Sequence, residues 1–252
     1  MSSGAPWRIF LAVEGPSDLS RLRTLVDHFL RKHAGGAQSV DELRSFQGLD
    51  GGGYGGLPYI PIKAIPELAR ARGLDRRYSP GGPRKGDGGT LRKLYQVLQK
   101  EKLLTPRSVV LWARDDDGDP SRREDAKEAR DSLPATTPLL LAIATECGEA
   151  WVIAGWKPAP EEVKLRTWRK ALGFSPQTRP WLLSHKENVP KSAKAVLADI
   201  FDGDEELEAA ALIAAAESES EASRESGLHA FCEELKQWLS QARGSLGHGP
   251  AA

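Results

Sequence analysis

Four aspartates occupy five consecutive positions in the middle of the chain, shortly after an apolar run. The run Val109–Trp112 has the length and composition of a buried strand. Side chains alternate between the two sides of an extended chain, so Asp115, Asp117 and Asp119 are expected to converge while Asp116 faces elsewhere. Carboxylates this close repel one another unless a hard cation such as Mg²⁺ or Mn²⁺ lies between them. The pattern is typical either of a metal site or of a solvated acidic turn before a helix.

Two further acidic residues follow predicted strands. Glu14 comes directly after the apolar run Trp7–Val13, and Glu149 comes shortly after the run Leu139–Thr145. In open α/β sheets the carboxyl ends of the strands are where sites form, because the turns there bring residues from different strands together. Each residue taken alone is equally typical of a helix start, where a carboxylate interacts favourably with the helix dipole.

The order of the apolar segments predicts an α/β fold. Between the three strands, helical spacing predicts helices over Ser17 to about His33, over Thr90–Lys102 with Thr90 as N-cap, and over Arg122–Leu133. Strands separated by helices form a mainly parallel sheet flanked by those helices, which is a Rossmann-like arrangement. An edge strand over Leu57–Ile62 and a short helix over Pro66–Gly73 are also expected.

Residues 35–89 form a glycine-rich insertion with no match to the phosphate-binding P-loop pattern. From Lys63 to Arg107 the chain has twelve Lys or Arg residues and four Asp or Glu residues. Arg84 and Lys85 lie among the glycines, where a basic loop is able to follow a phosphate backbone. A solvated loop with scattered charges is the alternative interpretation.

The chain after residue 156 reads as helical. Helices are expected over Glu161–Leu172, Lys191–Phe201 and Leu228–Leu239, separated by a stretch from 202 to 226 with nine acidic residues and one Arg. That stretch is interpreted as a helix or a linker. We therefore predict an α/β domain over residues 1–156, a helical C-terminal region over 157–243 and a disordered tail over 244–252.

The composition indicates in which cellular environment the protein works, but it does not indicate a particular function. The 35 basic and 35 acidic residues balance, so the total charge favours no particular polyelectrolyte as partner. The two cysteines lack the spacing of a zinc site and are too few for a disulfide framework. The first apolar run is short for a signal peptide, and no later one is long enough to cross a membrane. We expect a cytoplasmic protein.

The acidic motifs taken together resemble the TOPRIM domain of topoisomerases, primases and related nucleases. The phrase VEGPSD at 13–18 looks like the first motif of the overcoming-lysogenization-defect nucleases, and the DxDxD pattern at 115–119 looks like the second TOPRIM motif. The phrase CGEAWVIAG at 147–155 is similar to a helix of small stand-alone TOPRIM proteins. The likeness covers about residues 7–155, and the glycine-rich insertion departs from it. No topoisomerase tyrosine domain or primase zinc module accompanies it.

The resemblance implies roles for the acidic residues. Glu14, Asp115 and Asp117 would hold one or two Mg²⁺ or Mn²⁺ ions, and Asp119 and Glu149 would complete or orient the ligand shell. Glu14 is often the general base or acid in relatives, and that role remains open beside the role of ligand.

The implied activity is metal-dependent cleavage of phosphodiester bonds in DNA or RNA, in bacterial defence or repair, with a separate ATPase as possible partner. Arg114, Lys85 and Arg84 would contact the substrate, although Arg114 equally suits an ion pair with Asp116. Two alternatives remain open. One is a phosphohydrolase or nucleotidyl transferase acting on nucleotides, and the other is a non-catalytic subunit that binds a partner protein.

Overall fold

The computed structural model describes residues 5–34, 39–50, 55–74 and 86–246 of the chain. The chain divides into two compact units that interleave along the sequence. Unit 1 consists of Met1–Leu19, Leu30–Arg114 and Pro120–Leu141. Unit 2 consists of Ser20–Phe29, Asp115–Asp119 and Ala142–Ala252. A domain boundary after residue 156 remains a prediction.

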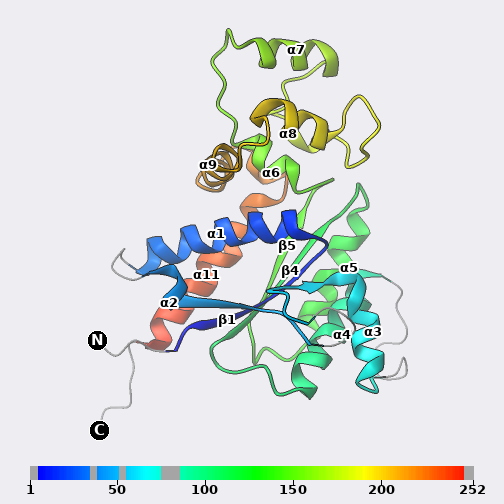
Figure 1. The fold of residues 1–252 in the computed structure, drawn as a ribbon, viewed down its shortest axis with the longest axis vertical. Helices are drawn as coiled ribbons and strands as arrows, with labels where there is room; N and C mark the ends of the chain where they lie inside the picture. Colours follow the sequence, from blue (N-terminus) through cyan, green and yellow to red (C-terminus); the bar gives the residue numbers. More distant parts are fainter. Residues whose placement is uncertain (1–4, 35–38, 51–54, 75–85, 247–252) are drawn as a thin grey trace. The chain divides into compact units, whose positions relative to one another are not determined.

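The fold is α/β with a mostly parallel, Rossmann-like sheet, as predicted. The strands follow in chain order: β1 Trp7–Val13, β2 Arg44–Gln47, β3 Ile60–Pro61, β4 Ser108–Asp115 and β5 Leu139–Ala144. The sheet order is β2-β1-β4-β5, with β3 also paired to β1 (Figure 1). β2, β3 and β4 each run parallel to β1. The central strands β1 and β4 are therefore flanked on both sides.

Burial explains which strands the sequence revealed. β1 and β4 are apolar over most of their length, and residues such as Ile9, Leu11 and Leu111 are fully buried. Parallel strands covered on both faces have such continuous apolar runs. β3 is shorter than the predicted edge strand because proline limits ladder pairing. β2 was not predicted, since it has four residues of mixed polarity and Phe46 as its one large apolar side chain.

The helical segments of unit 1 lie between its strands along the chain. They are α2 Val40–Leu43, the 3-10 helix Ile62–Ala64, α3 Ile65–Ala71, α4 Asp87–Lys100 and α5 Pro120–Asp131. α4 contacts both α3 and α5 (Figure 1). A Cβ on Gly88 would lie 2.5 Å from the carbonyl oxygen of Asp125, so a glycine there permits the close approach of α4 and α5.

The start of α4 corrects a prediction. Thr90 was expected at the N-cap, but α4 begins at Asp87 and Gly86 is the N-cap. The Thr90 hydroxyl instead donates to the carbonyl oxygen of Gly86 at 3.3 Å, inside the first turn. The two glycines that suggested a loop are helical residues, because α4 lies against α5 at that point.

Helix α1, Pro16–Ala34, follows β1 as predicted. Unit 2 contains α6 Glu149–Ala154, α7 Val163–Leu172, a 3-10 helix Pro180–Leu182, α8 Ala193–Phe201, α9 Glu205–Ala216, α10 Glu221–Glu225 and α11 Leu228–Leu246. The acidic stretch 202–226 thus forms helices of the compact unit. α9 packs on α6 so closely that a Cβ on Gly155 would lie 1.7 Å from the carbonyl oxygen of Ala211.

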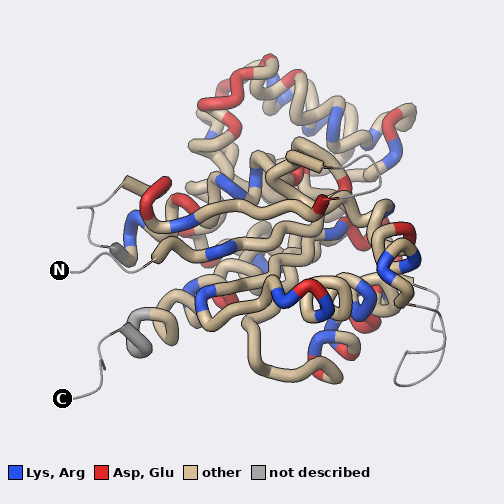
Figure 2. The backbone as a smooth tube through the Cα atoms, turned by 60° about the horizontal axis from the view of Figure 1, so that its bottom comes forward, with Lys and Arg blue, Asp and Glu red and all other residues tan. Residues whose placement is uncertain are grey.

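Helix α11 continues to Leu246, so residues 244–246 are helical and not part of a disordered tail. Both basic and acidic residues occur in many parts of the chain (Figure 2). Within the described ranges, no helix is both long and apolar enough to span a bilayer.

Candidate functional site

The loop after β4 folds around the buried carboxylate of Asp116. Its Oδ1 accepts hydrogen bonds from the backbone N–H of Gly118 at 3.1 Å and of Glu146 at 2.8 Å. Asp116 is 4% exposed. Asp117 has a left-handed backbone with φ of 51°, so the extended conformation ends at Asp115. The alternation that predicted convergence of Asp115, Asp117 and Asp119 therefore does not extend past the strand.

The predicted ligands in this loop differ in exposure. Asp115, the last residue of β4, and Asp117 are both half-buried. Asp119 is exposed and directly precedes Pro120, the first residue of α5. The backbone N–H of Asp119 donates to the carbonyl oxygen of Asp116 at 2.8 Å, which closes the turn. Of the three predicted ligands, Asp119 has the position of a helix-start residue.

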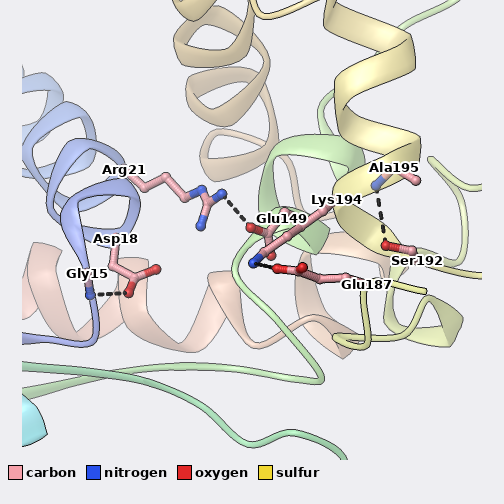
Figure 3. A network of polar contacts seen from close by, with 8 residues as sticks. All are labelled: Gly15, Asp18, Arg21, Glu149, Glu187, Ser192, Lys194 and Ala195. Atoms are coloured by element: carbon pink, nitrogen blue, oxygen red, sulfur yellow. Dashed lines mark hydrogen bonds and ion pairs between the residues drawn. The ribbon is translucent and has the colours of Figure 1, made fainter. Parts of the chain in front are cut away.

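Glu149, the first residue of α6, is paired with Arg21 of α1 within unit 2 (Figure 3). Arg21 Nη2 lies 2.9 Å from Glu149 Oε1, and the two side chains are 11% and 8% exposed. Burial alone would raise the pKa of Glu149, but the Arg21 charge and hydrogen bonds outweigh it and hold that pKa below its ordinary value. Glu149 is therefore a buried, ionised partner of Arg21.

Asp115 lies in the same charged neighbourhood. A Cβ built on Gly148 would be 2.9 Å from Arg21 Nη1 and 3.7 Å from Asp115 Oδ1. The adjacent Cys147 thiol is buried, and burial followed by the charges of Glu149 and Asp115 raises its pKa far above the ordinary value. A thiol held protonated in this way is a poor nucleophile at neutral pH.

A second ion pair lies beside Glu149. Lys194 at the start of α8 contacts Glu187 at 2.6 Å, as the dashed line in Figure 3 marks. The hydrogen bond to Glu187 raises the pKa of Lys194, with a smaller contribution from Glu149. Glu149 and Glu187 are thus each paired with a cation.

Glu146 contacts the acidic loop, and His185 contacts Glu146. Neither residue was predicted as a site residue. His185 Nδ1 lies 3.1 Å from Glu146 Oε2. Glu146 has a left-handed φ of 64°, and a Cβ on Gly118 would lie 2.5 Å from its Oε1. Glu146 had a signal, because it directly follows a strand that ends at the same sheet edge. His185 lies in an irregular segment with no such signal.

In unit 1, Arg114 lies between two carboxylates. Its Nη1 pairs with Glu14 Oε1, and its Nε lies 3.2 Å from Asp87 Oδ1. The register pairs Ala12 of β1 with Trp112 of β4, so Glu14 and Arg114 each come two residues later on neighbouring strands. Arg114 therefore pairs with Glu14 and Asp87, whereas Asp116 had been the alternative partner.

Asp87 was not predicted as a site residue. It is 8% exposed and begins α4, within the glycine-rich stretch that was read as a loop. The available signal was an acidic residue just before a strongly periodic helix, where a carboxylate is favoured by the dipole. Arg84 and Lys85, the predicted substrate contacts of this stretch, lie outside the described residues.

The donor types suit a hard cation, since carboxylate oxygens are the ligands that Mg²⁺ prefers. Glu14 and Glu149 are each engaged by an arginine, so either one would have to exchange that arginine for the metal. Among the described residues, no group of three or more His, Cys, Asp or Glu side chains has an arrangement ready to hold a metal. The ligand set remains a prediction.

Comparison with known proteins identified no relative of this chain. Searches against protein-family models, curated proteins and solved structures gave no match to this chain.

Proposed function

We propose that the protein is a divalent-metal-dependent nuclease with a TOPRIM-type carboxylate site, acting on DNA or RNA in the cytoplasm. The observation that supports this proposal best is the strand order. β1, β4 and β5 are consecutive neighbours in the sheet. Acidic residues follow all three strands: Glu14, the Asp115–Asp119 loop, and Glu146 with Glu149. Carboxylates at the carboxyl ends of neighbouring parallel strands are a suitable ligand source for Mg²⁺ or Mn²⁺.

Different residues would have different roles in phosphodiester cleavage. Asp115 and Asp117 would supply ligand oxygens, and the buried Asp116 would hold their loop through its two backbone hydrogen bonds. A bound Mg²⁺ would lower the pKa of a coordinated water and neutralise charge on the phosphate oxygens. Glu14 would act as ligand or general base, and Arg114 would turn from Glu14 toward the substrate phosphate.

A non-catalytic subunit that binds a partner protein is the second candidate, favoured by one observation. Two of the five predicted ligands, Glu14 and Glu149, form ion pairs with Arg114 and Arg21. Arginine supplies the positive charge that a metal would otherwise bring to these carboxylates. In this candidate the pairs are permanent, and an ATPase or other partner would provide the activity.

Cleavage assays separate the two candidates. Supercoiled plasmid, single-stranded DNA and single-stranded RNA would be incubated with the wild type in Mg²⁺ and then in Mn²⁺. The nuclease proposal expects cleavage that falls about 100-fold or more in Asp115→Asn and in Glu14→Gln. Asp131→Asn is the matched control, because Asp131 is 69% exposed at the end of α5.

An inert wild type, or cleavage that survives both site substitutions, would overturn the nuclease proposal. Phosphate release from free nucleotides in the same assays would move the proposal to a phosphohydrolase acting through these carboxylates. Circular dichroism of each variant shows whether a loss of activity reflects unfolding.

A further inference from the structure

The segment 157–194 of unit 2 has a charge imbalance that the zero net charge of the chain conceals. It contains nine Lys or Arg residues and three Asp or Glu residues. The stretch 202–226 that follows has nine acidic residues and one Arg. Unit 2 therefore separates its two signs of charge along the sequence, with the basic part on α7 and the loop before α8.

Helix α7 is oriented by its apolar side and by contacts to α8. Leu165 and Leu172 are buried. Lys164 Nζ donates to the carbonyl oxygen of Ile200 at 3.2 Å, and Trp168 Nε1 donates to Asp199 Oδ2 at 2.7 Å. Both contacts attach α7 to the C-terminal end of α8, and Figure 1 shows these two helices as neighbours.

This attachment leaves one face of α7 in solvent. Val163, Arg166, Thr167 and Lys170 recur at helical spacing, and all four are exposed. Val163 is 67% exposed, although it is apolar. Arg166 and Lys170 are one helical turn apart, about 6 Å along the axis, so both cations lie on the same side of α7.

The loop before α8 continues this basic face. Ser184 and Ser192 form a bridge, and the N–H of Ser184 donates to the carbonyl oxygen of Lys191 at 2.7 Å, which holds the loop closed at its base. Lys191 Nζ lies 5.6 Å from the ring centre of Phe174. Because Phe174 follows the C-terminal end of α7, this contact joins the loop to the helix.

Most cations of this surface have no carboxylate partner. Arg166, Lys170, Arg179 and Lys186 are exposed, and none of the four is ion-paired with another residue in the described part of the chain. Of the three acidic residues in the segment, two precede α7, and Glu187 pairs with Lys194. An ordinary solvated helix face usually mixes the two signs of charge, which this surface does not.

Apolar and aromatic groups accompany the cations. Leu182 is 44% exposed, and Phe174 and Trp181 are half-buried. Planar rings among spaced cations are the combination that binds single-stranded nucleic acids, since the cations contact phosphates and the bases stack on the rings. An acidic protein partner would use the cations but leave the rings without a stacking role.

We propose that the α7 surface, defined as Arg166, Lys170, Phe174, Arg179, Trp181, Lys186 and Lys191, binds single-stranded nucleic acid. The binding is electrostatic with stacking and requires no metal. It goes beyond the proposed nuclease activity, because it assigns a strand-binding surface outside the residues that resemble TOPRIM. It would hold as a binding activity even if the carboxylates catalyse nothing.

The test measures fluorescence anisotropy of a labelled single strand of about 20 nucleotides, as DNA and as RNA, in EDTA. Salt is varied between about 50 and 200 mM. Arg166→Gln/Lys170→Gln is expected to weaken binding about tenfold and to reduce the slope of log affinity against log salt by about 1.4, two contacts at about 0.7 each. Arg179→Gln/Lys186→Gln is expected to act in the same direction.

The matched control is Lys102→Gln/Lys127→Gln, which removes the same charge from two exposed residues of unit 1 and is expected to leave binding unchanged. Thermal unfolding curves that overlay the wild type show that each variant is folded. Absence of strand binding by the wild type in EDTA would overturn the proposal. So would an equal loss in the control, which indicates bulk charge, or equal affinity for duplex and single strand. Because no metal is present, these outcomes are independent of the cleavage assay.

Discussion

Each unit contains an arginine paired with a glutamate, and the two pairs differ in exposure. In unit 2, Arg21 and Glu149 are 11% and 8% exposed. In unit 1, Arg114 is 22% exposed, and its partner Glu14 is 39% exposed. Both are arginine–glutamate pairs, but the pair in unit 1 is more accessible to solvent.

This difference determines what each arginine can do. A buried charge that loses its partner has no water to replace it, so a buried pair is locked in place. A pair that is partly in solvent is worth little and opens readily. We therefore interpret Arg21–Glu149 as a structural pair and Arg114–Glu14 as a pair that is able to exchange partners. Of the two glutamates predicted as metal ligands, Glu14 is the better candidate.

The largest expected effect comes from removing Arg21. Arg21→Met should lower the free energy of unfolding by about 3–5 kcal/mol, because it leaves Glu149 charged and buried. Arg114→Met should lower it by less, because Glu14 remains in contact with water and Asp87 keeps its favourable position at the start of α4. Urea unfolding monitored by circular dichroism measures both.

A double variant, Arg21→Met/Glu149→Leu, checks the cause. It should recover a large part of the stability lost in Arg21→Met, since no unpaired charge remains. Equal losses in Arg21→Met and Arg114→Met would mean that burial does not distinguish the two clusters.

The next effect concerns the loop that contains Asp115 and Asp117. Asp116→Ala should cost about 2–3 kcal/mol, because the backbone N–H groups of Gly118 and Glu146 lose their charged acceptor. Asp131→Ala, at an exposed position, should cost under about 0.5 kcal/mol. The same urea unfolding measurement compares them. A negligible loss in Asp116→Ala would show that the loop is held by other contacts.

The pH dependence of stability tests the charge of Glu149. The pKa of Glu149 is held below its ordinary value, so its ionised form adds stability that is fully present above the unfolded pKa. That stability is lost as the pH falls through the lower, folded pKa. Wild type and Glu149→Gln should therefore differ at pH 7, and their difference should shrink on acidification below about pH 4.5.

Thermal unfolding over a pH series measures this convergence. Glu219→Gln, at an exposed position between α9 and α10, is the matched control and should follow the wild type throughout. A Glu149→Gln difference that stays constant down to pH 3 would contradict ionisation of Glu149 as the source of the stability.

The sheet was predictable because β1, β4 and β5 are buried along most of their length. β1, β4 and β5 appear in the sequence as unbroken apolar runs, and the acidic residues after them follow directly. β2 was missed because its four residues have no such run. β2 is short and only partly buried, so its sequence signal is weak.

The site was less predictable because its pairings depend on tertiary contacts. Strand alternation grouped Asp115, Asp117 and Asp119, but the left-handed backbone of Asp117 ends the alternation. Nothing local to Glu149 indicates a partner 128 residues away in Arg21. Asp87 was hidden by glycines that become helical where α4 meets α5.

The smallest expected effect tests whether the Arg114 cluster is able to exchange partners. Glu14→Gln should lower stability by about 0.5 kcal/mol or less at low salt, and this difference should vanish as salt rises. Urea unfolding at two salt concentrations measures it. The corresponding Glu149→Gln difference should persist in high salt, because a buried pair is screened less. A Glu14→Gln effect as large and as salt-resistant as that of Glu149→Gln would make Glu14 structural, and the proposed site would then lose the acidic residue after β1.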